Sequence, residues 1–250
     1  MEQQASEQRN HCALCLKPAQ LRRSHIIPEF FYSSLYEVTQ GRTLTTRSAI
    51  HRRRNEVRQK GYYERLLCGP CESKISQWER YMSHLWYGKT PAKTRIENML
   101  AHVEGIDYHK LKLFQLSVLW RAGVSTLPIF EKVNLGHHEK RLRAMLLAAD
   151  PGDWNNYPCV LTWLNLDGRP LNDLIVEPTP CRGLVHGWAY TFVFGGFLWS
   201  FQLAGVPKAK QAFVVSTNGS LTMVIRDALQ IGYLRDAIAR VVRADEASDS

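Results

Sequence analysis

The 250-residue sequence has few cysteines, no internal repeat and no low-complexity tract. Four of its six cysteines stand in two Cys-x-x-Cys pairs, which leaves too few for a disulfide framework. The first ten residues, MEQQASEQRN, lack the apolar stretch of a secretory signal. We therefore expect a reducing, cytoplasmic location. With 45% hydrophobic residues, the chain can build one large core or two modest ones.

Acidic residues are scarce in the first part of the chain. Residues 1–100 contain 17 Lys and Arg against 9 Asp and Glu, whereas residues 101–250 contain 15 against 14. The net charge of +9 is therefore concentrated in the first 100 residues. Because a clustered basic surface attracts phosphates, we expect nucleic acid to bind to this part.

Residues 184–206 contain no Asp, Glu, Lys or Arg and are long enough to span a bilayer as a helix. Their aromatic residues instead alternate with smaller ones, which is the period of a strand, and Gly195-Gly196 can form a two-residue turn. A hairpin about this turn pairs six rings on one face: Phe194 with Phe197, Phe192 with Trp199, and Tyr190 with Phe201. We predict this hairpin and no membrane contact, with a spanning helix as the alternative.

The two cysteine pairs are Cys12-Ala-Leu-Cys15 and Cys68-Gly-Pro-Cys71. In each, the spacing lets two thiolates grip one zinc ion from a tight turn. Four thiolates close a tetrahedral shell and leave no place for water, so the predicted zinc is structural. The alternative is a chance spacing of reduced core cysteines.

Ser24-His25-Ile26-Ile27-Pro28 lies between the pairs, and Glu72 directly follows the second pair. Residues 11 to about 82 thereby resemble the HNH endonuclease superfamily, in its four-Cys zinc-finger, treble-clef branch with a ββα-metal core. The resemblance implies that His25 is a general base, which activates water to attack a phosphodiester. It further implies a catalytic Mg²⁺ or Mn²⁺ bound by Glu72, and products with a 5′-phosphate and a 3′-hydroxyl.

Three positions depart from the pattern of that family. Ser24 stands where the family often has Asp, Tyr63 where it commonly has Asn, and Glu72 where its final His usually stands. A carboxylate suits Mg²⁺ or Mn²⁺, so the last change gives a workable H-x-E arrangement. Asn55 and Glu79 are further residues that could complete the metal shell. For Glu79, a solvated helix carboxylate is the alternative.

A polar, basic segment at residues 40–61 is interpreted as an exposed insertion. Together with two arginines beside His25, it could follow a nucleic-acid backbone with little base specificity. The alternative is a solvated loop that binds nothing, since most runs of charged residues are solvated. The predicted nucleic-acid-binding residues are Arg22, Arg23, Arg52, Arg53, Arg54, Arg58 and Lys60.

The periodicities predict an α+β fold with a helical middle and a C-terminal antiparallel sheet with a terminal helix. The resemblance implies that the N-terminal part is a zinc-stapled ββα-metal (HNH-like) module. We expect the module at 11–90, a second unit at 91–243 and flexible tails at 1–10 and 244–250. Helices are predicted from the second cysteine pair to about residue 87, and over 93–103, 108–122, 137–149 and about 227–243. Strands are expected from about residue 158, including 173–177, 212–216 and 221–225.

These observations predict a metal-dependent endonuclease with little sequence specificity, for which DNA is the favoured substrate. The second unit would serve regulation, oligomerisation or the docking of an activating sensor protein. Such an arrangement is similar to effectors of anti-phage or mobile-element systems, by fold-level analogy. Two alternatives remain: a non-catalytic zinc module that binds DNA or RNA, and an RNase toxin on the same core.

Overall fold

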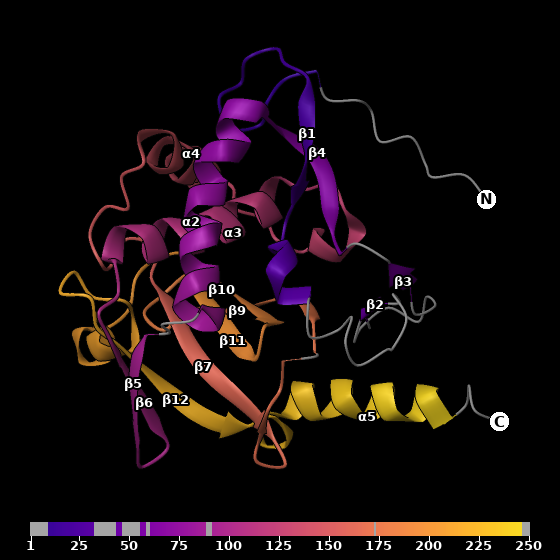
Figure 1. The fold of residues 1–250 in the computed structure, drawn as a ribbon, viewed down its shortest axis with the longest axis vertical. Coiled ribbons are helices and arrows are strands. Elements are labelled where there is room, and N and C mark those ends of the chain that lie inside the picture. Colours follow the sequence, from indigo (N-terminus) through magenta and orange to yellow (C-terminus); the bar gives the residue numbers. More distant parts are fainter. Residues whose placement is uncertain are drawn as a thin grey trace.

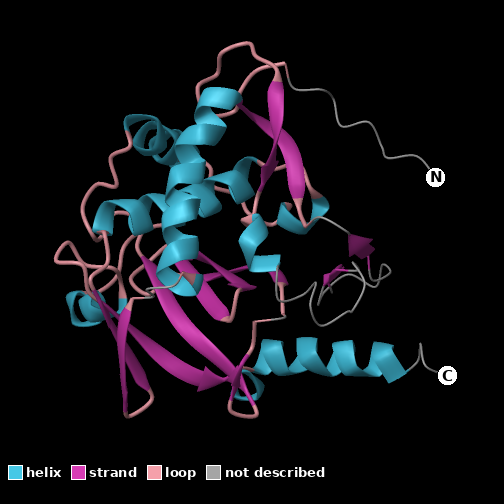
Figure 2. Cartoon of the chain, viewed as in Figure 1, coloured by secondary structure: helices cyan, strands magenta, loops and turns pink. Residues whose placement is uncertain are grey.

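The computed structural model describes residues 10–32, 44–46, 56–58, 61–88, 92–172 and 174–246. The protein is α+β, as predicted: three helices, α2, α3 and α4, lie over one large sheet, and a separate two-stranded pair stands at the far end (Figures 1 and 2). A fourth helix, α5 (Gly232–Glu246), lies on the side of the sheet away from α2 and α3 (Figure 1), where its Leu234 and Ala237 pack with Leu164 and Val193.

The N-terminal part folds as a turn, a strand pair and a helix. Residues 12–15 form the first turn, β1 (Leu21–His25) pairs antiparallel with β4 (Tyr63–Cys68), and α2 (Gly69–Tyr87) follows directly. Pro70 sits in the first turn of α2, where its missing N–H costs nothing. The apolar stripe of α2 is buried, as its helical spacing predicts: Ile75, Trp78, Met82 and Leu85.

Three short elements of the described residues lie between β1 and β4 in the sequence. The 3₁₀-helix η1 (Glu29–Tyr32) follows β1, and the strands β2 (Leu44–Thr46) and β3 (Glu56–Arg58) pair antiparallel with each other. Part of the predicted basic insertion therefore contains a small strand pair.

The central helix is α3 (Tyr108–Val124), followed by η2 (Pro128–Phe130) and α4 (His138–Ala148). The Asp107 side chain caps α3 by accepting from the N–H of Lys110 at 3.0 Å. Every residue from Leu111 to Ala122 is buried, so α3 packs against the rest of the protein on all sides. Two cationic side chains are carried into the interior with it, Lys112 and Arg121.

The large sheet has the strand order β5-β6-β12-β7-β11-β10-β9, with β8 paired to β7. Its strands are β5 (Lys93–Glu97), β6 (Leu100–Glu104), β7 (Cys159–Leu166), β8 (Arg169–Pro170), β9 (Val176–Arg182), β10 (Trp188–Phe194), β11 (Phe197–Gln202) and β12 (Leu221–Asp227). The last segments are η3 (Lys208–Phe213), η4 (Ala228–Gln230) and α5 (Gly232–Glu246). The predicted antiparallel sheet is instead mixed, because β12 pairs with β7 in parallel.

The aromatic hairpin is confirmed in its register. Phe194 pairs with Phe197, Phe192 with Trp199 and Tyr190 with Phe201, and all six rings are buried. Gly195 and Gly196 form the turn with φ of 60° and 82°, and a Cβ on Gly195 would overlap the Phe31 ring. In the described part of the chain, no helix has the length and apolar character needed to cross a membrane.

Three predictions of secondary structure are wrong in type or in bounds. The helix expected over 93–103 is the hairpin β5–β6, whose turn residues Asn98 and Met99 have φ of 49° and 62°. A pair of left-handed residues matches the twist of a tight hairpin and breaks a helix. The strand expected over 212–216 is occupied in part by η3, and the strand expected over 173–177 begins later, as β9.

The sheet separates two apolar clusters. The larger cluster runs without a break from Cys12 in the first turn to Ile225 in β12, and includes the buried faces of α2 and α3. The smaller one lies under α5 and contains Leu164, Val193 and Leu234. The larger cluster joins the part of the chain that contains the two cysteine pairs to the sheet through shared side chains.

Candidate metal centre and adjoining His25 site

The four paired cysteines converge at one point of the structure. The sulfur atoms of Cys12, Cys15, Cys68 and Cys71 all lie within 4.8 Å of one another, and those of Cys15 and Cys68 are 3.8 Å apart. Thiolates that share one tetrahedral zinc, each about 2.3 Å from the ion, lie about 3.8 Å apart. The four residues could therefore hold a structural metal such as zinc, as the sequence predicts.

The thiols of this centre have strongly perturbed acidities. Burial raises the pKa of Cys12, but backbone hydrogen bonds from Cys15, Cys68 and Leu14 outweigh it and lower that pKa to about 7. Burial raises the pKa values of Cys68 and Cys71, and the neighbouring thiols contribute to the rise. Neighbouring thiolates repel one another, and a bound cation would compensate their charge.

His25 is the last residue of β1, on the outer face of the β1–β4 pair. Tyr63 lies directly opposite it in the antiparallel register, and the two ring centroids are 5.9 Å apart at an interplanar angle of 66°. Tyr63 thus occupies the cross-strand position beside the candidate base, where the resembling family commonly has Asn.

Glu72 lies in the first turn of α2, beside the end of β1. Its Oε2 accepts a hydrogen bond of 2.5 Å from the buried Ser24 hydroxyl. Burial raises the pKa of Glu72, while this hydrogen bond and the charges of Arg121 and His25 lower it in part. The fold therefore places Glu72 in contact with Ser24 and near enough to His25 for the charge of that residue to act on its pKa.

A second carboxylate, Glu79, follows about two turns further along α2. Its Oε1 lies 2.6 Å from Nη1 of Arg121, which makes an ion pair, although that oxygen accepts no well-aligned hydrogen bond. Among the described residues, the four-cysteine set is the only group of three or more Cys, His, Asp and Glu side chains that could share a metal ion. The residues around His25 thus supply at most part of a cation shell.

Basic side chains continue along the outer face of the β1–β4 pair. Arg23 is paired directly with Arg65 across the two strands, and both are exposed. The guanidinium of Arg23 lies 5.2 Å from the centroid of the Tyr63 ring, and Arg22 is exposed next to it. Like charges placed opposite each other destabilise a sheet. This face is therefore suited to bind an anion.

The remaining predicted nucleic-acid-binding residues cannot be placed at this site. Arg52, Arg53, Arg54 and Lys60 lie outside the described residues, as does Asn55. Arg58 ends β3, but its side chain is also outside the described part.

Two residues near His25 were missed by the sequence analysis. Arg65 could have been found, because strand alternation in β4 places it on the face of Tyr63. Arg121 carries no such signal, because it stands in an otherwise apolar helix whose pattern predicts core.

Comparison with known proteins gives no family for this chain: no family model, curated protein or solved structure matches it.

Proposed function

We propose that the protein is a metal-dependent endonuclease, with His25 as the general base and Glu72 as a ligand of a divalent cation. It is supported by the position of Glu72 beside the end of β1, where its Oε2 accepts a hydrogen bond from Ser24, the residue before His25, next to four cysteines that could hold a metal. The zinc would hold the scaffold, and the chemistry would take place next to it.

In this mechanism His25 accepts a proton from a water molecule. The water oxygen then attacks phosphorus, and the bond to the 3′-oxygen breaks, which leaves a 5′-phosphate and a 3′-hydroxyl. A divalent cation bound at Glu72 would supply positive charge for the pentacovalent phosphate and the leaving oxygen. A carboxylate fits Mg²⁺ or Mn²⁺, and such ions often take their other ligands from water and substrate phosphate.

The substrate would lie along the outer face of the β1–β4 pair. Arg22, Arg23 and Arg65 would bind backbone phosphates, and Tyr63 offers an aromatic face beside His25. These residues lie on strands, and none belongs to a helix that could enter a DNA groove, so we propose little base specificity. DNA is the favoured substrate. An activating partner and self-association through the rest of the chain are part of the same proposal.

The test is cleavage of plasmid DNA with Mg²⁺ or Mn²⁺, with EDTA as the metal-free control. His25→Ala should abolish cleavage while zinc content and nucleic-acid binding stay unchanged, because a positioned base contributes about 10²–10⁴-fold in rate. His186→Ala is the matched control, since His186 is exposed in the loop between β9 and β10. A His25→Ala protein that cuts at the wild-type rate would exclude this mechanism.

A second candidate is a zinc module that binds nucleic acid without cutting it. It is favoured by the partial cation shell around Glu72, and by the ion pair that engages Glu79 with Arg121. The same assay separates the two functions: this candidate predicts binding to plasmid with no metal-dependent cleavage under any condition.

A further inference from the structure

Arg121 reaches the His25 site from α3, far outside the zinc-binding part of the sequence. Its side chain is fully buried. Nη1 donates a hydrogen bond of 2.5 Å to the main-chain oxygen of His25, and the same nitrogen lies 2.6 Å from Oε1 of Glu79. One nitrogen atom thus joins the end of β1 to the middle of α2.

The guanidinium is held in place by its own helix. Nε donates to the Ser117 carbonyl at 3.2 Å, and Nη2 lies 3.4 Å from the Ser117 hydroxyl. That hydroxyl in turn donates to the Phe114 carbonyl at 2.7 Å. A buried guanidinium is costly unless its donors are used and its charge is compensated, and here both conditions are met.

His25 needs such support because the ladder ends at it. On one side Tyr63 is its cross-strand partner, and the next residue, Ile26, donates to the Tyr62 carbonyl at 2.9 Å. The His25 carbonyl is fixed by Arg121 instead. Fixing the peptide plane after His25 fixes the direction in which its imidazole leaves the backbone.

We propose that Arg121 is a positioning residue of the His25 site: its guanidinium orients the His25 backbone and holds the Glu79 carboxylate away from Glu72. Catalysis by the N-terminal part would then depend on α3. This inference rests on the proposed function, because it assigns Arg121 a role in the same site.

The competing explanation is that Arg121 only compensates the charge of Glu79. A double variant separates the two roles. Arg121→Met alone leaves a buried carboxylate unpaired and should destabilise the fold, whereas Arg121→Met with Glu79→Gln removes both charges together and should fold. Glu79→Gln alone is the matched control, and Arg121→Lys tests partial rescue by a shorter cation.

If Arg121 positions His25, the folded double variant should lose about 10-fold to 100-fold in kcat with little change in KM, since a misplaced catalytic group costs that much. Glu79→Gln keeps the hydrogen bond from Arg121 to His25, so its folded fraction should lose much less kcat than the double variant, and Arg121→Lys should recover part of the loss. A wild-type kcat in the double variant would overturn the proposal.

A second measurement does not depend on activity. In protein carrying ¹³C-labelled histidine, the His25 ring signal, assigned by its loss in His25→Ala, should shift or broaden in the double variant, while the His186 signal stays unchanged. An unchanged His25 signal would overturn the positioning role, whatever happens to kcat. If the wild type cuts nothing with either metal, the ring signal alone decides whether Arg121 orients His25, independently of the nuclease proposal.

Discussion

The Ser24 hydroxyl donates a hydrogen bond of 2.5 Å to Oε2 of Glu72, although 48 positions separate the two residues in the chain. Ser24 is fully buried, so the hydroxyl has Glu72 as a partner where water does not reach it. The resembling family often has a carboxylate at the Ser24 position. Here the carboxylate stands on α2, and a hydroxyl on β1 orients it.

Glu72→Ala should be inactive because the cation loses its carboxylate ligand. Raising the Mn²⁺ concentration should restore part of the cleavage, since a weakened site fills at higher metal concentration. The same titration should leave His25→Ala inactive, because metal does not replace a base. Cleavage rates measured across a Mn²⁺ series check both variants, and equal rescue of the two would contradict the division of roles.

Ser24→Ala should reduce cleavage by roughly 10-fold and leave zinc content unchanged. The substitution removes the hydrogen bond that orients Glu72 and leaves a buried carboxylate oxygen with one donor fewer, at a cost of about 1–3 kcal/mol. Ser24→Thr keeps the hydroxyl and serves as the control. The measurement is kcat with Mg²⁺ for the three proteins, and equal rates would show that the Ser24 hydroxyl has no part in the site.

The purified protein should contain about one zinc ion per chain. Cys68→Ser should lose that zinc and much of its stability, because the metal joins a turn to a helix that lies more than 50 residues further along. Cys181→Ser is the control, since Cys181 lies in β9 outside the four-cysteine set. Elemental analysis with thermal unfolding gives the answer. Equal zinc in Cys68→Ser and wild type would mean that the site is misassigned.

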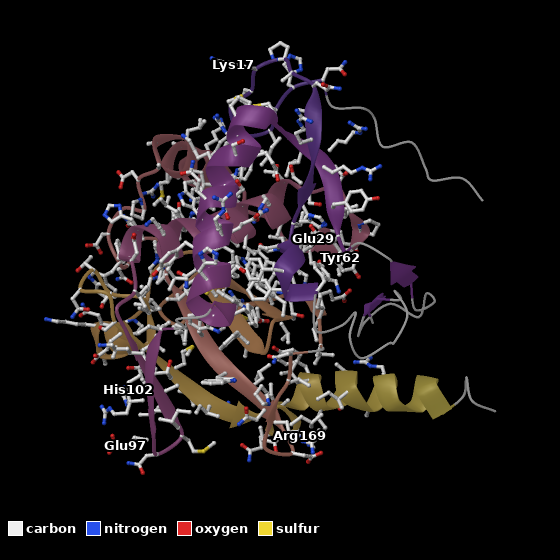
Figure 3. All side chains as sticks on the ribbon, viewed as in Figure 1. Lys17, Glu29, Tyr62, Glu97, His102 and Arg169 are labelled. Atoms are coloured by element: carbon white, nitrogen blue, oxygen red, sulfur yellow. The ribbon has the colours of Figure 1, made fainter. Side chains whose placement is uncertain are left out.

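Replacing both Arg23 and Arg65 by Gln should weaken binding similarly for unrelated sequences. Removing one arginine that binds a phosphate should lower the slope of log K against log salt by about 0.9, so removing two should lower it by about 1.8. Arg169→Gln is the control, because Figure 3 places Arg169 at the opposite end of the molecule from Lys17 and the zinc-binding turn. An unchanged slope in the double variant would exclude this face from the interface.

Lys112 should make the stability depend on pH. Its Nζ donates to the Tyr157 carbonyl at 3.0 Å, and burial lowers its pKa from an ordinary 10.5 to about 7. Between these values the unfolded chain holds more protons than the folded one, so stability rises with pH. The loss of stability caused by burying a charged Lys112 is complete below about pH 7.

The rise should reach about 1.4 kcal/mol per pH unit from pH 7 to 9. Lys112→Met should remove it, and Lys140→Met, at an exposed position of α4, should not. Denaturant unfolding of the three proteins at several pH values measures the difference. Parallel pH profiles for wild type and Lys112→Met would contradict the assignment.

Sequence patterns predicted the elements whose signal is local. The alternating rings around Gly195-Gly196 predicted the pairing of β10 with β11, and the stripe from Ile75 to Leu85 predicted the buried face of α2. The β5–β6 hairpin was missed because it is stabilised by a distant strand: β6 pairs with β12, more than 100 residues away. Non-local pairing leaves no periodic signal in a short window.

The site shows the same contrast. The two cysteine pairs predicted a metal centre because ligand spacing is a local signal. Arg121 could not be predicted, since its hydrogen-bond acceptor His25 and its ion-pair partner Glu79 lie 96 and 42 positions earlier in the chain. Only the packing of α3 against α2 and β1 brings them together.

A hydrogen bond joins the two ends of the segment that connects β1 to β4. The Tyr62 N–H, just before β4, donates to the hydroxyl of Tyr32, at the end of η1, at 3.2 Å. Tyr62 and Glu29 lie close together in Figure 3, far from Lys17 and the zinc-binding turn. Gly61 has φ of 68°, and a Cβ there would meet the Tyr32 ring at 2.7 Å, so this entry point tolerates only glycine.

We therefore expect that the segment between Tyr32 and Gly61 can be replaced as a unit. Halving its length changes the entropy of closing the segment by only about 0.6 kcal/mol, so a short Gly/Ser replacement of residues 33–60 should leave the zinc centre and the fold intact. Substitutions within this stretch should then leave the placement of His25, Glu72 and the four cysteines unchanged.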